Sequence, residues 1–318
     1  VARKSTYYGA AYGLERLPSK LTTRWQQVRA PSELHLPPPN DFIPRSLTMV
    51  DTTQRAELPR RIDAVTSLDL WHATDTSFGI PHSSFAVSFR SPLVYRTVKE
   101  AVMLRLYLGL VNDQLNEFAY PADLAGIVYS LYPHRRGFSL RVAGYSDREE
   151  RLLTQLLDVL AEPALAQDRF ELIKTDLARS YANARQKPPF RLAIATLHHL
   201  LVSPNWTPAQ SLAAVESITL EQLQAFVPQL LSNLDTTALS HGNLRPLKAE
   251  KLAALVSAKI PGVRRPSNRT ARSRIVRFKA QANYLRPIRS EHTDDAVLVY
   301  VQLGEPSIED RAKTALLA

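Results

Sequence analysis

Histidines are the residues of this 318-residue chain best suited to metal binding or proton transfer, because the chain contains no cysteine. A helical zinc site needs two histidines at positions i and i+4, so that both ring nitrogens reach one ion, with a carboxylate nearby. No two of the eight histidines have this spacing. His198 and His199 are adjacent, and on a helix they point about 100° apart, which prevents both from binding one metal. The eight are His35, His72, His82, His134, His198, His199, His241 and His292.

Other motifs that carry chemistry are also missing from the sequence. It contains no G-x-G-x-x-G, Walker or G-x-S-x-G motif, and glycine accounts for only 10 of 318 residues, which disfavours phosphate-binding loops. Four acidic residues in the predicted helices stand among basic residues, so we interpret them as surface ion pairs. These are Glu117, Asp123, Glu149 and Glu171. The sequence therefore predicts no catalytic, cofactor-binding or metal-binding residue in this chain.

The pattern of apolar residues predicts strands first, then helices, then strand again. Residues 84–91 alternate as a strand with one buried face, 97–118 have helical spacing, and 127–132 with 138–145 form a hairpin. Five helices follow, two of them opened by predicted capping boxes at Ser146–Glu149 and Thr219–Gln222. A strand at 236–240 and a helix at 246–259 complete the unit. This order favours an α+β fold, in which an antiparallel sheet carries helices packed on one side.

Two segments interrupt the pattern. Three consecutive prolines, Pro37–Pro39, predict an extended linker that runs to about residue 54. Residues 263–289 contain nine lysines and arginines and no acid, within a chain of net charge +10. That basic stretch is interpreted either as a solvated linker or edge strand, or as a wall facing a polyanion or an acidic substrate. Beyond it, residues 296–303 predict a strand, and Ser307 predicts the start of a capped helix.

Several segments of the sequence resemble the insulinase and pitrilysin family of zinc metallopeptidases. The resemblance extends from about Ala2 to the last residue and is most specific in its longer runs. The runs are Tyr8-Gly9-x-x-Tyr12, Leu36-Pro37-x-x-Asn40-x-Phe42-Ile43-Pro44, Leu70-Trp71 with Asp75 and Phe78, Leu108-x-x-x-x-Asp113-x-Leu115-Asn116-Glu117-Phe118-Ala119-Tyr120, Ala122-x-Leu124-Ala125-Gly126-x-x-Tyr129, Gly144-Tyr145, Arg169-Phe170-Glu171-x-Ile173-Lys174, Ala225-Phe226-x-Pro228-x-Leu230-Leu231 and Leu239-x-His241-Gly242-Asn243.

The resemblance implies four similar domains in two halves that close around a chamber for peptides. On this pattern, 1–28 is the tail of the second domain, 29–54 the linker between the halves, 55–290 the third domain and 291–318 the start of the fourth. The chain lacks an initiator methionine, as expected of an internal piece. The H-x-x-E-H zinc motif of the family is absent from the sequence, so the resemblance implies that zinc is bound by the first domain and that this segment forms chamber wall and hinge.

The expected partners are therefore peptide substrates and the first and fourth domains of the same polypeptide, without nucleic acid or membrane. Two alternatives remain open at this stage. One is a non-catalytic structural protein with the same fold, and the other is a nucleic-acid-binding protein that uses residues 263–289, although only Phe278 and Tyr284 could stack on bases there. A weaker form of the second is that the basic stretch favours acidic peptides. A periplasmic location is expected, with the cytoplasm as the alternative.

Overall fold

The computed structural model describes residues 3–29, 38–51, 58–266, 274–279 and 282–302, together with 307, 309–311 and 313. The chain divides into two compact units, Val1–Pro39 and Asn40–Ala318. The first unit contains an antiparallel pair of short strands, β1 (Arg3–Lys4) and β2 (Ala11–Tyr12), followed by helix α1 (Ser19–Gln27).

The second unit is built on a sheet of seven strands. Six of them lie in the order β3–β4–β9–β5–β7–β6, and β10 pairs with β9 outside this order. Neighbouring strands are antiparallel except in the pairs β4–β9 and β9–β10. Their bounds are β3 (Arg60–Ile62), β4 (Asp69–Thr74), β5 (His82–Arg90), β6 (Ile127–His134), β7 (Gly137–Tyr145), β9 (Leu234–Gly242) and β10 (Val263–Arg264). The predicted α+β class with a mainly antiparallel sheet is confirmed.

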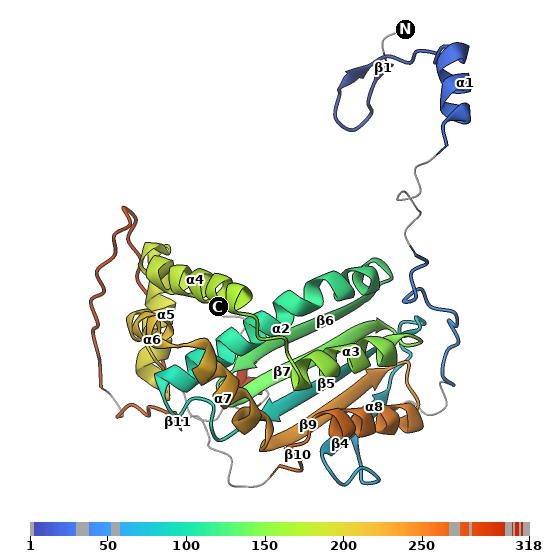
Figure 1. Cartoon of the computed structure of the whole chain (residues 1–318). Coiled ribbons are helices and arrows are strands. Elements are labelled where there is room, and N and C mark those ends of the chain that lie inside the picture. Colours follow the sequence, from blue (N-terminus) through green and yellow to red (C-terminus); the bar gives the residue numbers. More distant parts are fainter. Residues whose placement is uncertain are drawn as a thin grey trace. The chain divides into compact units, whose positions relative to one another are not determined.

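The helices of this unit form a layer against the sheet (Figure 1). Helices α2, α3 and α8 pack on the strands, and α4 and α6 pack in turn on α2. A two-stranded pair, β8 (Val202–Ser203) with β11 (Arg274–Ile275), lies apart from the main sheet. The helices are α2 (Val98–Leu124), α3 (Glu149–Ala161), α4 (Gln167–Ala182), a 3₁₀ turn (Asn183–Gln186), α5 (Pro189–Leu201), α6 (Pro208–Ser217), α7 (Leu220–Leu231) and α8 (Pro246–Lys259).

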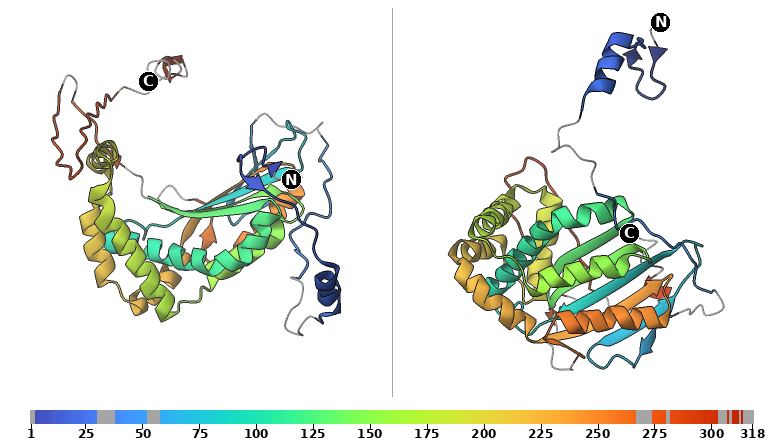
Figure 2. Two further views of the ribbon diagram at one scale, coloured as in Figure 1. Left: turned by 90° about the horizontal axis from the view of Figure 1, so that it is seen from above. Right: turned by 45° about the vertical axis from the view of Figure 1, so that its right-hand side comes forward.

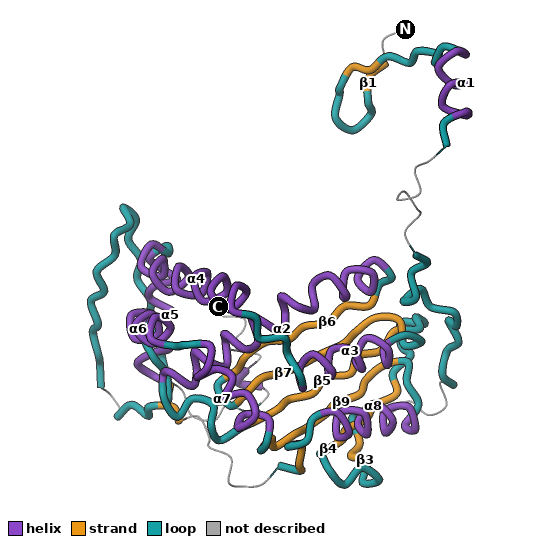
Figure 3. The backbone as a smooth tube through the Cα atoms, in the orientation of Figure 1, coloured by secondary structure: helices purple, strands orange, loops and turns teal. Residues whose placement is uncertain are grey.

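The sheet has helices on one face only. The left view of Figure 2 shows the strands on one side and α2 with its neighbours on the other, and Figure 3 shows the two layers by secondary structure. Side chains alternate accordingly along β5, where Ser83, Phe85, Val87 and Phe89 are buried against the helices and the residues between them are partly exposed. The hydrophobic core therefore lies between the sheet and the helices.

Most predicted elements are confirmed, some with different ends. Helix α8 has the predicted bounds, and the predicted capping box that begins at Thr219 forms. A further capping box begins at Thr207. Helix α2 continues six residues beyond the predicted end at Phe118, through Pro121 in its last turn. A proline there removes only one helical hydrogen bond.

Two predictions at helix and strand starts are wrong. The capping box at Ser146 does not form, because Arg148 is the N-cap of α3 and makes no side-chain capping bond. The Ser146 hydroxyl instead donates to the carbonyl of Pro81. The strand predicted at 296–303 is absent from the described residues 296–302, where Val297 and Val299 are exposed and no neighbouring strand supplies hydrogen bonds. The predicted cap at Ser307 does form, since Ser307 and Asp310 exchange hydrogen bonds.

The beginning of the basic stretch contributes to the fold. The Nε of Arg264 lies 2.8 Å from a carboxylate oxygen of Asp235, which is buried. The guanidinium of Arg265 donates to the carbonyl of Val65 at 2.7 Å. These two arginines hold β10 against the sheet, whereas Arg269 and Arg272 lie outside the described residues. None of the described helices is both long and apolar enough to cross a membrane.

Candidate functional site: the open face of the sheet

The face of the sheet that carries no helices is a surface that this unit could offer to a partner. We call it the open face and define it by the outward residues of β4, β9, β5, β7 and β6. The register aligns five of them in a row across these strands, namely Trp71, Leu239, Ala86, Arg141 and Ser130. Trp71 and Leu239 are each 38% exposed, so the row begins with an apolar patch. Such a surface can accept both apolar and hydrogen-bonding groups of a ligand.

Polar side chains of the open face are held by bonds across the strands. The Nε of Arg141 donates to the hydroxyl of Ser84 at 2.8 Å, and Arg90 donates to the hydroxyl of Thr237 at 3.0 Å. The Nδ1 of His134 accepts a hydrogen bond from the backbone N–H of Arg136, so the ring proton is on Nε2. This Nε2 donates to the hydroxyl oxygen of Ser88, and the two atoms are 3.3 Å apart. Burial lowers the pKa of His134, with a smaller contribution from the positive charges of Arg136 and Arg90.

Two histidines mark one corner of the open face, which we call the histidine corner. His241 lies at the end of β9 and His82 at the start of β5, and both line a cavity of about 200 Å³. The Nε2 of His241 is 3.5 Å from a carboxylate oxygen of Asp75. The ring of His82 packs edge-on against Tyr145, with centroids 4.5 Å apart. His241 is thus a polar residue at the end of a strand.

His72 lies on the opposite, buried face of the same strands. Thr74 donates its hydroxyl proton to the carbonyl of Leu244, so its oxygen accepts from the Nε2 of His72 at 3.1 Å. The Nδ1 of His72 is then an acceptor for the hydroxyl of Ser240 at 3.2 Å. Burial, and next the nearby His241, lower the pKa of His72. This neutral imidazole therefore fastens β4 to β9.

Glu149 is not the surface residue that the sequence predicted. It is the first residue of α3, it is 1% exposed, and its carboxylate accepts a hydrogen bond of 2.8 Å from the buried hydroxyl of Ser83. Burial raises the pKa of Glu149 to about 7, although the Ser83 bond and the charge of Lys248 lower it in part. Sequence reasoning missed this group because an acid in the first turn of a helix is usually an exposed favourable charge.

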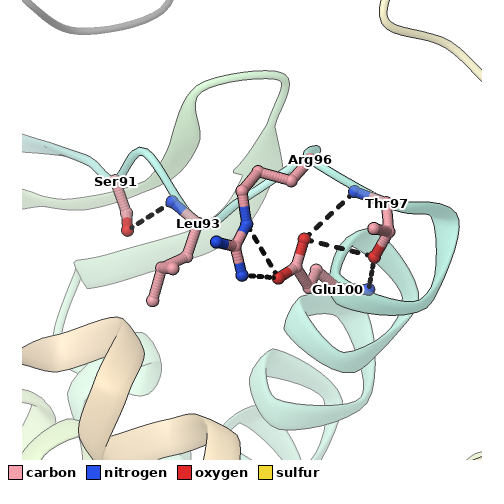
Figure 4. A network of polar contacts seen from close by, with 5 residues as sticks. All are labelled: Ser91, Leu93, Arg96, Thr97 and Glu100. Atoms are coloured by element: carbon pink, nitrogen blue, oxygen red, sulfur yellow. Dashed lines mark hydrogen bonds and ion pairs between the residues drawn. The ribbon is translucent and has the colours of Figure 1, made fainter.

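Helix α2 starts with a dense polar network, which was not singled out from the sequence (Figure 4). The hydroxyl of Thr97 accepts from the backbone N–H of Glu100, and the Glu100 carboxylate accepts from the backbone N–H of Thr97 at 3.0 Å. Arg96 adds a bond of 3.0 Å from its Nε to the same carboxylate. Nearby, the hydroxyl of Ser91 accepts from the backbone N–H of Leu93. The network fixes the start of the helix.

The remaining histidines are distributed over the unit. His198 is exposed and His199 is partly buried on α5, as expected for adjacent helical positions. His292 lies 3.3 Å from Asp294, and His35 is outside the described residues. Within the part of the chain that the structure describes, no group of three histidine, aspartate or glutamate side chains is placed to hold a metal ion.

Comparison with known proteins identifies the family. The sequence model of the family described as the middle or third domain of peptidase M16 matches residues 1–214. The chain belongs to the M16 peptidase family. It is 35% identical to human insulin-degrading enzyme over 243 residues, which cover 76% of this chain and 24% of that enzyme. The chain thus spans about a quarter of the length of such M16 relatives.

Two further M16 relatives extend the comparison. A Schizosaccharomyces pombe protein provisionally named as a zinc protease is 27% identical over 318 residues, covering 98% of this chain and 33% of the yeast protein. The crystal structure of pitrilysin aligns with 82% of this chain and 28% of its own, with a TM-score of 0.67 and 22% identity. The M16 fold is therefore shared.

Zinc, which the M16 names imply, does not fit the described residues. Zinc in peptidases is held by imidazole and carboxylate ligands. Helix α2 instead buries Met103, Leu104 and Leu106 in the core, and the hydroxyl of its buried Tyr107 donates to the carbonyl of Leu160. Burial raises the pKa of Tyr107, which stays a neutral phenol. No zinc chemistry is assigned to these residues.

Proposed function

We propose that this chain is the non-catalytic middle region of a zinc metallopeptidase and that its open face is a wall of the chamber in which peptides are cleaved. The match to a middle or third M16 domain supports the position of the region. The names of the relatives, which include insulin-degrading enzyme and a provisional zinc protease, support peptide cleavage by the longer protein.

The observation that carries the proposal is the one-sided covering of the sheet. A sheet face that stayed in water would be expected to hold mainly polar side chains. The open face instead exposes Trp71, Leu239, Val128 and Tyr132 beside the hydroxyl and guanidinium groups of its cross-strand bonds. Aromatic and aliphatic side chains next to hydrogen-bonding groups suit side chains of an unfolded peptide.

The remaining roles follow from the same proposal. In this proposal zinc and the residues that would hold it belong to a domain outside this sequence, where the metal would supply the Lewis-acid chemistry of peptide hydrolysis. Residues 1–28 form the end of a preceding domain, 29–54 connect the two halves, 55–290 form the wall, and 291–318 begin the next domain. Partners of this region are then peptides and the other domains of the polypeptide.

A pair of substitutions in the full-length protein tests the wall. Leu239→Gln places a polar side chain on the open face, whereas Leu172→Gln makes the same change on the outer surface of α4, where Leu172 is 45% exposed. We expect Leu239→Gln to raise KM for a peptide substrate severalfold with kcat and zinc content unchanged, and Leu172→Gln to change neither constant. Equal KM values in both variants and the wild type would show that the open face does not bind the peptide.

The structural alternative makes a separate prediction. If the longer protein has kept the fold but lost its metal site, the full-length protein binds no zinc and cleaves no peptide.

The nucleic-acid alternative is weakened by Arg264 and Arg265, whose guanidinium groups are already bonded within the fold.

A further inference from the structure

Residues 40–50 pack along the sheet-containing unit as a segment that we call the strap. No helix or strand forms in it, so its backbone N–H groups need partners other than a regular ladder. Side-chain oxygens are among these partners. The N–H of Phe42 donates to Oδ1 of Asn40 at 2.9 Å, that of Arg45 to Asp147 at 2.8 Å, and that of Val50 to Asn243 at 2.7 Å.

The first end of the strap is anchored on α2. The Nδ2 of Asn40 donates to the carbonyl of Pro121 at 2.7 Å. Phe42 is 3% exposed and packs edge-on against Phe118, with ring centroids 5.5 Å apart. From α3, the guanidinium of Arg151 lies 5.6 Å from the centre of the Phe42 ring and pairs with Asp41, the residue before it. These contacts explain why the unit boundary falls just before Asn40.

The second end is held by Asn243, whose side chain makes three hydrogen bonds. Its Oδ1 accepts the N–H of Val50, and its Nδ2 donates to the carbonyl of Thr48 at 3.0 Å and to the hydroxyl of Ser146 at 3.3 Å. The backbone N–H of Asn243 donates to the carbonyl of His82 at 2.7 Å. Asn243 is buried and stands two residues after His241. One residue thus contacts both the strap and the histidine corner.

We propose that Asn243 is a clasp that binds the strap to the sheet and couples the position of the strap to the histidine corner of the open face. The functional part of this inference rests on the proposed function, in which the strap continues the connection between the two halves and the open face meets peptide. A displacement of the strap would then be transmitted to the surface that contacts substrate. The hydrogen bonds from Asn243 to Val50, Thr48 and His82 would transmit it.

Hydrogen exchange of single amides in the 318-residue chain tests the clasp. Asn243→Ala removes both strap bonds, and we expect the amide of Val50 to exchange about tenfold faster than in the wild type. Asn243→Asp retains an acceptor for Val50 and loses the donor to Thr48, so its Val50 amide should exchange at an intermediate rate. Asn205→Ala is the matched control, because the Asn205 side chain bonds to His198 far from the strap in sequence. It should leave the strap unchanged.

The coupling has its own readout in the same variants. Ring resonances of His82 and His241, followed by NMR, should change in Asn243→Ala and stay constant in Asn205→Ala. Wild-type exchange at Val50 in the folded Asn243→Ala and Asn243→Asp variants would overturn the clasp. Faster exchange at Val50 with unchanged histidines would overturn the coupling. Neither measurement uses peptide turnover, so a failed wall experiment leaves both results interpretable.

Discussion

The hydroxyl of Ser83 donates to the carboxylate of Glu149 in the interior of the unit, where the two groups join strand β5 to the start of α3. Both residues are buried, and the pKa of Glu149 is raised to about 7 because burial disfavours the charged form. The ordinary value for this group is 4.5. An acid whose pKa rises on folding keeps its proton in the folded state over a range in which the unfolded chain has lost it.

Glu149 should therefore make the stability of the unit depend on pH. Between pH 5 and pH 8 the unfolded chain binds fewer protons than the folded state, so the free energy of unfolding falls as pH rises. We expect the wild type to lose about 2 to 3 kcal/mol relative to Glu149→Gln over this range, because one pKa unit corresponds to about 1.4 kcal/mol. Urea unfolding of both proteins at the two pH values measures the difference.

The neighbouring residue supplies the control for this measurement. Glu150 is ion-paired with Lys248 at the surface, where such pairs contribute about 0 to 1 kcal/mol. Glu150→Gln should retain the pH dependence of the wild type. If the free energy of unfolding changed equally with pH in the wild type and Glu149→Gln, Glu149 would already be ionised at neutral pH.

Phe42 should contribute to stability as a core residue, although it lies in the segment predicted as a linker. Phe42→Ala is expected to reduce the free energy of unfolding by about 3 to 5 kcal/mol, the usual result of emptying a phenylalanine site. Phe78, which is 84% exposed, is the control, and Phe78→Ala should change stability by less than about 0.5 kcal/mol. Similar losses in the two variants, measured by urea unfolding, would mean that the strap does not pack on the unit in solution.

Tyr107 should stabilise the end of α3 through its hydroxyl. The carbonyl of Leu160 is among the last four of α3, which lack partners within the helix, and the Tyr107 hydroxyl donates to it. Tyr107→Phe should cost about 1 kcal/mol and should increase hydrogen exchange in the last turn of α3. Tyr120→Phe, at an exposed position of α2, the helix that also contains Tyr107, should have no such effect. An unchanged stability in Tyr107→Phe would contradict the role of this bond.

The sequence alone predicted a helix or strand correctly where a single local pattern determines that element. Alternation identified β5, and the capping box at Thr219 marked the start of its helix. The parallel pairing of β4 with β9 joins segments about 170 residues apart, and no local pattern indicates it. The error at Glu149 has the same origin, since an exposed first-turn acid and a buried one look alike until β5 is placed beside α3.

The open face was only partly predictable. A sheet with helices on one side was expected, and that expectation implies an uncovered face. The row from Trp71 to Ser130 depends on the register of five strands, which side-chain alternation alone does not fix. The strap was predicted as an extended linker because Pro37–Pro39 prevents regular pairing there, whereas its anchors on Pro121, Asp147 and Asn243 come from distant parts of the chain.

The most direct test of the central claim is the zinc content and peptidase activity of the purified 318-residue chain, measured beside the full-length protein after both are equilibrated with zinc and dialysed. The proposal predicts that the full-length protein retains zinc and cleaves a fluorogenic peptide, while the 318-residue chain retains no more zinc than a chelator-treated sample and cleaves nothing. One zinc ion per 318-residue chain, together with peptide hydrolysis by that chain, would contradict the proposal that this region is a wall and that the metal is bound elsewhere.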